Sequence, residues 1–238
     1  CIYVTTAGQS LHFAQWFKVV ELMGYDWYDR LVHVPYGTMS LNGEKLGTRS
    51  GNVVWLKQLM NMSIEKVRGV IEEKNPDLPN KDEVAEEVGV GAIVFNYLSN
   101  SRIKDISFDL ESALDFNGNT GPYVQYTYAR CCSILSKAGE TGGVSPLTIT
   151  DPTESALVKT LSRFPEKVKE ALAAYEPSMM TRYILDVAAD FNRFYHDCQI
   201  LSAEDPAVRA SRIKLTQATK TVLGNAFGLI CLKKPEKI

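Results

Sequence analysis

Residues 178–198 read SMMTRYILDVAADFNRFYHDC. Apolar side chains recur in this stretch at spacings of four and three residues, which is the period of one face of a helix. We therefore expect an amphipathic helix that is capped by Ser178, packs into a protein core and ends before Pro206. The apolar face consists of Met180, Ile184, Val187, Phe191, Phe194 and Cys198.

Further helices are expected around this one. A helix start at Thr120-Gly121-Pro122 and a stop at Ala138-Gly139 predict one of them. An apolar stripe from 157 to 171 contains Pro165, which kinks or splits its helix. Antiparallel helices joined by short linkers predict a helical bundle. A last helix, from about residue 207, is expected to direct inward Val208, Leu215, Val222, Ala226 and Leu229.

The N-terminal residues have a different pattern. Residues 1–6 and 31–36 are rich in β-branched and aromatic side chains and predict two strands. A helix between them is expected to begin at Ser10 as its N-cap and to end at Gly24. Strand, helix and strand predict a parallel βαβ unit. Because one such unit cannot bury both faces of a parallel sheet, we expect its other strands to come from sequence upstream.

Two segments join these patterns. The four glycines within residues 37–52 predict a mobile loop. Residues 53–101 predict helix, broken at 75–79 by two prolines. The predicted fold is therefore an α/β segment over residues 1–109 followed by an all-α helical bundle over residues 110–238, mostly helical overall.

The composition limits the class of protein. The chain has 238 residues with 45% hydrophobic content, which suits packed cores rather than disorder. Its 26 basic and 28 acidic residues give a net charge of -2, so any nucleic-acid surface has to be local. No apolar run of about 18 residues and no signal-peptide pattern are present, which indicates a soluble cytoplasmic protein without a membrane partner. The five cysteines form no C-x-x-C pair, and His196 and Cys198 lack further ligands, so we expect reduced thiols and no bound metal.

The segment Lys45-Leu46-Gly47-Thr48-Arg49-Ser50-Gly51-Asn52 gathers two cations, two hydroxyls and several backbone donors. Such a loop suits a polyphosphate, because cations and N–H groups can close over its charge. The P-loop pattern is absent. An ordinary exposed turn explains the same residues, and from the chemistry alone both interpretations stay open.

A second group of candidate residues lies on the helix that starts at Thr120. Tyr123, Tyr126 and Arg130 follow one another at spacings of three and four residues, with Gln125 beside them. Aromatic rings that stack on unpaired bases, next to an arginine that meets phosphate, are typical of binding to single-stranded RNA loops. Buried tyrosines with satisfied hydroxyls are the alternative. Residues 182–238 contain nine basic and six acidic side chains, a local excess that fits an RNA stem.

Longer motifs resemble a known family. Residues 3–13 (YVTTAGQSLHF), 33–37 (HVPYG) and 45–54 (KLGTRSGNVV) resemble the second half of the catalytic domain of arginyl-tRNA synthetases. Residues 118–130 (GNTGPYVQYTYAR) are similar to the entry into the anticodon-binding domain of that family. The motifs Arg182-Tyr183, Phe191-Asn192-x-Phe194-Tyr195 and Pro235-Glu236-Lys237 also match. The resemblance is collinear along nearly the whole chain.

The resemblance implies the C-terminal part of a Rossmann-type class I catalytic domain followed by a helical anticodon-binding domain. The implied activity is ATP-dependent attachment of L-arginine to arginine tRNA through an arginyl-adenylate, with Mg²⁺ accompanying ATP. The HIGH motif of the family is absent from these residues, so we expect the isolated chain to be inactive. The parent enzyme is expected to be monomeric. A free-standing, non-catalytic tRNA-binding module is the alternative.

The resemblance also implies roles for single residues. Residues 45–50 correspond to the KMSKS element, which leaves Lys45 and Arg49 as its cations. The residues that depart from the family pattern are Leu46, Gly47, Thr48 and Ser50, the last at a position where many relatives keep a lysine. The implied catalytic residues are Lys45, Thr48 and Arg49, and the implied arginine-binding residue is Gln9. The implied ATP-binding residues are His12, His33, Gly37, Thr38, Met39 and Lys45, with contacts largely through the backbone at residues 37–39. The implied tRNA-binding residues are Tyr123, Gln125, Tyr126 and Arg130.

Overall fold

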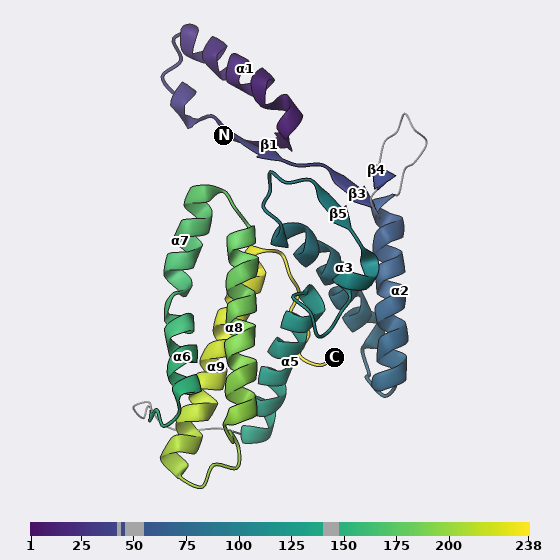
Figure 1. Ribbon diagram of the computed structural model, residues 1–238, viewed down its shortest axis with the longest axis vertical. Helices are drawn as coiled ribbons and strands as arrows, with labels where there is room; N and C mark the ends of the chain where they lie inside the picture. The colour runs from purple at the N-terminus through teal and green to yellow at the C-terminus, as the bar shows by residue number, and fades with distance from the viewer. Residues whose placement is uncertain (42–43, 46–54, 140–147) are drawn as a thin grey trace.

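The structure is a computed structural model that describes residues 1–41, 44–45, 55–139 and 148–238. A small α/β part, a central helix pair and a helical bundle follow one another along the chain (Figure 1). The α/β part contains β1 (Ile2–Thr6), the 3-10 turn η1 (Ala7–Gln9), α1 (Ser10–Leu22), η2 (Tyr28–Arg30), β2 (Val32–Tyr36), β3 (Met39–Leu41) and β4 (Glu44–Lys45). The helix pair is α2 (Leu56–Lys74) and α3 (Lys81–Ser99), and β5 (Ile106–Phe108) and α4 (Leu110–Ala113) follow it. The bundle consists of α5 (Gly121–Ala138), α6 (Pro152–Ser162), α7 (Phe164–Ala174), α8 (Ser178–Asp197) and α9 (Pro206–Leu229).

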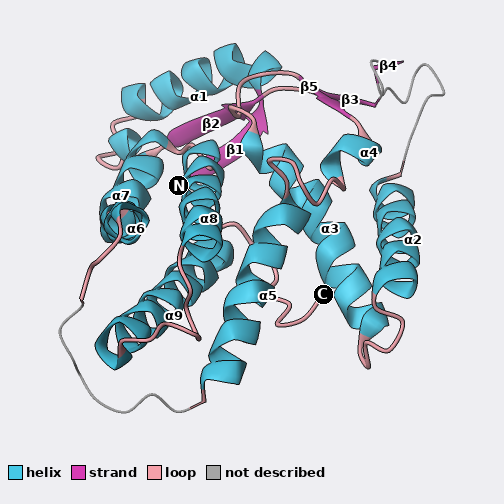
Figure 2. Ribbon diagram, turned by 60° about the horizontal axis from the view of Figure 1, so that its bottom comes forward, coloured by secondary structure: helices cyan, strands magenta, loops and turns pink. Residues whose placement is uncertain are grey.

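The predicted parallel βαβ unit is confirmed. β1 and β2 pair in parallel, with Tyr3 opposite His33. The alternation of side chains along β1 sends Tyr3 toward α1, where its ring centroid lies 5.2 Å from those of Phe13 and Trp16. Ile2 and Val4 point the other way and line an apolar cavity of about 690 Å³ against α7, α8 and α9. Figure 2 shows α1 and the bundle on opposite sides of the two strands.

The prediction of a loop over residues 37–52 is wrong in part, because β3 pairs antiparallel with β4 as a β-hairpin there. Residues 42–43 and 46–52 of the expected loop lie outside the described residues. β5 then adds to β3 as a parallel strand, with Met39 opposite Ile106. Ile106 and Phe108 are buried and give the three strands their apolar side. The partners are far apart in sequence, so the local glycine content gave no sign of this pairing.

The helix pair expected at residues 53–101 is confirmed, together with its break near residues 75–79. α3 packs against α2 on one side and against α5 and α8 on the other. The backbones approach closely at two glycines, because a Cβ on Gly89 would lie 2.9 Å from Cα of Ile64 and one on Gly121 would lie 2.8 Å from the carbonyl oxygen of Gly91. α3 therefore joins the two halves of the molecule.

The bundle expected from the 178–198 pattern is confirmed. Phe191 and Phe194 of α8 are fully buried together with Leu157 of α6 and Phe227 of α9. Pro165 divides α6 from α7, as expected from its missing N–H. In Figure 1, α8 lies between α6 and α7 on one side and α5 on the other. The predicted mostly helical chain is observed.

Three local predictions are corrected. Ser10 and Ser178 are the first residues of their helices rather than N-caps, because the chain before each is already in a turn or helical conformation. Their hydroxyls donate backwards, from Ser10 Oγ to the carbonyl oxygen of Ala7 and from Ser178 Oγ to Glu176 Oε1. Leu229, expected inside, is 54% exposed because α9 ends there. The Thr120 cap is confirmed, since its Oγ1 accepts from the backbone N–H of Tyr123.

Within the described ranges no helix is long and apolar enough to cross a bilayer. All five cysteines have free thiols, and those of Cys131, Cys132 and Cys198 are buried. Burial raises the pKa of the Cys131 thiol, which keeps it protonated at neutral pH.

Candidate functional site

The carboxyl ends of β1 and β2 meet at one edge of their sheet, with Thr6 opposite Tyr36. Parallel sheets bind ligands at this edge because loops and helix starts converge there. Exposed Gln9 follows β1 in η1, and Gly37 follows β2 directly. The structure thus brings the expected arginine-binding residue and the expected ATP-binding segment to the same edge.

The two candidate histidines differ in their surroundings. His12 is exposed on α1, with its ring edge-on to Phe13. The His33 ring is stacked on Phe13 at a centroid distance of 4.4 Å, and its Nε2 lies 2.9 Å from Oγ1 of Thr5. The His33 side chain is therefore held within the sheet and α1, which leaves His12 as the histidine with a free polar edge.

Residues 37–39 are fixed by the segment that precedes β5. The backbone N–H of Gly37 donates to the carbonyl oxygen of Arg102 at 2.7 Å. The backbone N–H and the hydroxyl of Thr38 both donate to Oδ1 of Asp105, at 2.7 and 2.8 Å. A Cβ on Gly37 would lie 2.2 Å from the carbonyl oxygen of Lys104, a clash with backbone atoms. This position requires glycine because the two segments touch there.

The expected catalytic loop is described only at its start. The backbone of Lys45 pairs with Ser40 in the hairpin. Thr48 and Arg49 lie outside the described residues. Met39, in the first strand of this hairpin, packs against the cluster around Phe108.

The candidate RNA-binding residues of α5 gather around Arg130. The guanidinium carbon of Arg130 lies 4.9 Å from the ring centroid of Tyr126 and 4.8 Å from that of Tyr195 on α8. Both rings are more than two-fifths exposed, at 43% and 44%. Nη1 of Arg130 donates to Oδ1 of Asn192, whose Nδ2 donates to the hydroxyl of Tyr123 at 3.0 Å. The cation is thus held between two exposed aromatic faces, an arrangement that accepts stacked bases or a phosphate.

Arg130 and Tyr195 line two adjoining clefts, of about 500 and 580 Å³. Lys137 lines both clefts, and the C-terminal Lys237 lines the second. This surface, formed by Tyr126, Arg130, Lys137 and Tyr195, is called the α5–α8 surface below. Tyr195 and Asn192 occur in a motif recognised in the sequence, but they had no assigned role because the spacing within α5 does not reveal residues on α8.

The expected contact of Gln125 with RNA is corrected. Its side chain is fully buried. Nε2 donates to the backbone carbonyl oxygens of Glu87 on α3 and Lys233 in the C-terminal tail, at 3.2 and 3.1 Å. A buried amide cannot reach a base, so Gln125 joins α3, α5 and the tail inside the protein. The spacing pattern included it only because it is adjacent to Tyr126.

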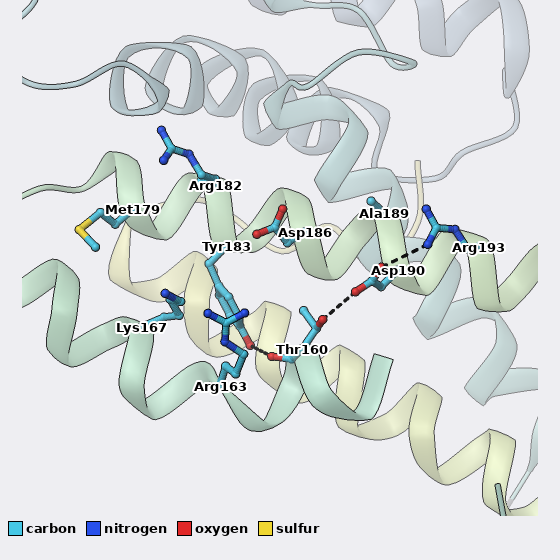
Figure 3. A pocket seen from close by; sticks show the side chains of 10 residues that line it. All are labelled: Thr160, Arg163, Lys167, Met179, Arg182, Tyr183, Asp186, Ala189, Asp190 and Arg193. Carbon is cyan, nitrogen blue, oxygen red and sulfur yellow. Dashed lines mark hydrogen bonds and ion pairs between the residues drawn. The ribbon is translucent and has the colours of Figure 1, made fainter. Parts of the chain in front are cut away.

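A third cleft, of about 440 Å³, lies on the other side of α8 (Figure 3). Asp190 accepts from Thr160 Oγ1 at 2.7 Å and pairs with Arg193 at 4.0 Å. Partial burial raises the pKa of Asp186, and the nearby Asp190 carboxylate raises it further. Burial also raises the pKa of Tyr183, to about 12. The four cationic side chains that line this cleft are Arg163, Lys167, Arg182 and Arg193.

This third cleft was missed by sequence reasoning. The signal was present, since Arg182, Asp186, Asp190 and Arg193 recur at helical spacing opposite the apolar face of α8. Four cations against two carboxylates leave a local positive excess. In the part of the chain that the structure describes, no cluster of three His, Cys, Asp or Glu side chains is placed to hold a metal ion.

The chain matches two families in sequence order. Residues 1–110 match the family described as tRNA synthetases class I (R), catalytic domain, and residues 124–238 match the DALR anticodon binding domain. A curated arginine–tRNA ligase of Alkaliphilus metalliredigens is 48% identical over 240 residues, and one of Halothermothrix orenii is 46% identical over 241. Each of these matches covers 100% of this chain but only 42% of the relative, so the chain spans about two-fifths of their length.

Solved structures give the same result. The arginyl-tRNA synthetase of Thermus thermophilus superposes with a TM-score of 0.92 at 35% identity, over 100% of this chain and 41% of that one. The arginyl-tRNA synthetase of Plasmodium falciparum superposes with a TM-score of 0.85 at 26% identity, again over 100% and 41%.

Proposed function

Because this chain belongs to the arginyl-tRNA synthetase family, we propose that it supplies part of the nucleotide site and the anticodon-binding domain of an arginine–tRNA ligase. The observation that carries the proposal is the match of residues 1–110 and 124–238, in that order, to a catalytic and an anticodon-binding family. The complete enzyme would join L-arginine to arginine tRNA with consumption of ATP. The boundary between the two domains is proposed to lie near residue 110.

In this proposal, the sheet edge binds the small substrates. The exposed Gln9 side chain would accept hydrogen bonds from the guanidinium of arginine through its carbonyl oxygen. The backbone at residues 37–39 would contact adenine, while His12 has an exposed ring at the same edge. His33 would contribute through its backbone, because its ring packs on Phe13.

Charge stabilisation is assigned to the segment that begins at Lys45. When ATP reacts with the arginine carboxylate, pyrophosphate leaves and its negative charge has to be balanced. We assign that role to Lys45 and Arg49, with Thr48 as a hydroxyl donor. Mg²⁺ would arrive with the ATP phosphates as part of that substrate.

RNA binding is assigned to the bundle. The exposed rings of Tyr126 and Tyr195 would stack on unpaired anticodon bases, and Arg130 between them would meet a base edge or a phosphate. The hydroxyl of Tyr123 would orient Arg130 through Asn192. The cationic cleft between α7 and α8 would attract the backbone of the same RNA.

We further propose a cytoplasmic, monomeric parent enzyme.

Aminoacylation tests this function. The full-length protein is expected to charge arginine tRNA with arginine in the presence of ATP, whereas the purified 238-residue chain is expected to charge none. Full-length protein that binds arginine tRNA but never charges it would indicate the non-catalytic RNA-binding module instead.

A further inference from the structure

One carboxylate at a corner of the bundle holds the loop that fixes residues 37–39. Glu176 lies between α7 and α8, where Tyr175 adopts a left-handed conformation with φ of 50° and turns the chain sharply. Its two oxygens point to different neighbours. Oε2 accepts from Ser101 Oγ at 3.3 Å, and Oε1 accepts from the backbone N–H of Arg102 at 3.3 Å.

The same carboxylate is itself anchored in the bundle. Oε1 of Glu176 also accepts from Ser178 Oγ at 2.9 Å, at the first turn of α8. Its backbone N–H donates to the carbonyl oxygen of Ala171 in α7. Close by, Thr181 Oγ1 donates to the carbonyl oxygen of Leu98 near the end of α3. The corner between α7 and α8 is therefore a fixed support for the segment that follows α3.

The segment at residues 101–105 in turn forms hydrogen bonds with Pro35, Gly37 and Thr38 at the end of β2. Nη1 of Arg102 donates to the carbonyl oxygen of Pro35 at 2.7 Å. The carbonyl oxygen of Arg102 accepts from the backbone N–H of Gly37, and Asp105 holds Thr38. The clash that a Cβ on Gly37 would make with Lys104 shows that the two backbone segments are in direct contact.

We propose that Glu176 is a positioning residue for the nucleotide-binding segment at residues 37–39, acting through Ser101 and Arg102. The inference rests on the proposed function, because it assumes that residues 37–39 bind ATP. In this proposal, a carboxylate that belongs to the RNA-binding bundle sets the shape of the ATP-binding edge. Loss of this carboxylate frees residues 101–105 and thereby shifts the backbone of residues 37–39, which the nucleotide is proposed to contact.

The test uses the full-length enzyme and four variants. Glu176→Ala removes both contacts to residues 101 and 102, and Glu176→Gln keeps an oxygen that can accept one of them. Ser178→Ala is the matched control, because it removes a bond of the same carboxylate on the side of α8 only. Gly37→Ala changes the ATP-binding segment directly. Steady-state amino-acid activation gives KM for ATP and kcat, and thermal melting and tRNA binding report on the fold.

We expect Glu176→Ala to raise KM for ATP about tenfold, because both contacts from the carboxylate to residues 101 and 102 are lost. The Kd for tRNA and the Tm should match those of Ser178→Ala, which keeps KM for ATP near its original value. Glu176→Gln should restore most of the loss. An equal rise of KM in Glu176→Ala and Ser178→Ala, or no rise in folded Glu176→Ala, overturns the positioning role. If Gly37→Ala also leaves KM for ATP unchanged, the proposed nucleotide site itself is wrong.

Discussion

The two ends of the molecule differ in how completely they bury their apolar side chains. In the α/β part, Ile2, Val4 and Leu22 are 54%, 63% and 76% exposed. In the bundle, Phe191, Phe194 and Phe227 are all 0% exposed. Both parts have a regular apolar pattern in sequence, but only the bundle has enough neighbouring elements to cover it.

This difference in burial indicates that the bundle provides most of the stability, while the α/β part carries the sheet edge. The bundle has a contiguous core contributed by all five of its helices. β1 and β2 form a two-stranded sheet with one covering helix, which is marginal by itself. We infer that the bundle and α3 support the fold within this chain, while the α/β part carries the sheet edge of the candidate site.

The largest expected difference in stability is between a substitution in the bundle core and one on β1. Phe191→Ala leaves a cavity at a fully buried site and is expected to lower the free energy of unfolding by about 3–5 kcal/mol. Val4→Ala, at a largely exposed site, should change it by less than about 0.5 kcal/mol. Urea unfolding followed by circular dichroism measures both. Similar losses for the two variants would mean that the α/β part is as tightly packed as the bundle.

Ion pairs should show the same contrast. Arg212 Nε donates to Glu154 Oε1 at 2.6 Å, with side chains only 13% and 1% exposed, and this pair ties α9 to the start of α6. Arg212→Met leaves the buried carboxylate without its counter-ion and is expected to lower the free energy of unfolding by about 3 kcal/mol.

The control for this pair lies on α1. Lys18 and Glu21 form an ion pair with side chains 59% and 38% exposed. Lys18→Met should change stability by no more than about 0.5 kcal/mol, because solvent already screens this pair. Equal losses for Arg212→Met and Lys18→Met, measured by thermal unfolding, would contradict the assigned difference between the two parts.

The RNA-binding assignment predicts a change in affinity without a change in fold. Arg130→Ala removes the cation between Tyr126 and Tyr195 and is expected to weaken arginine tRNA binding by about 1–2 kcal/mol. Gel-shift or anisotropy titration measures the loss. Lys18→Ala, on the exposed side of α1, serves as a charge-matched control, and an equal loss in that variant would point to non-specific attraction.

The smallest expected effect is a pH dependence at the junction of the two parts. Desolvation raises the pKa of Glu87 on α3 above that of an exposed glutamate, and nearby Glu83 raises it further. A carboxyl with a raised folded pKa destabilises the folded state when ionised. Glu87→Gln should therefore increase the free energy of unfolding at neutral pH, by less than about 0.5 kcal/mol. The gain should disappear below about pH 4.5, where Glu87 is protonated in the folded and unfolded states. A gain that persists at pH 4 would exclude this cause.

The fold was predictable where side-chain periodicity is local. The helix at 178–198, the split at Pro165 and the parallel pair of strands all follow from spacing, caps and β-branched content. The hairpin of β3 and β4 with β5 was not predictable, because its stabilising contacts join residues 39–41 to 106–108. The two misplaced caps, Ser10 and Ser178, share one cause, since a preceding turn already continues into the helix.

The candidate site was predictable in its chemistry but only partly in its geometry. Arg130 and Tyr126 were identified from spacing along α5, and Tyr195 completes their arrangement from α8. Gln125 is buried because side chains one residue apart on a helix point about 100° apart. The role of Glu176 depends on contacts with residues more than 70 positions away, which no local pattern contains.

We expect the bundle of this chain to read RNA through the α5–α8 surface without any further protein. The most direct test measures binding of this chain to arginine tRNA and to the same tRNA with an altered anticodon, at two salt concentrations. We expect the altered anticodon to weaken binding by about tenfold, or 1.4 kcal/mol, at both concentrations. Equal binding to both tRNAs, with a steep loss of affinity at high salt, would show phosphate attraction alone and contradict the claim.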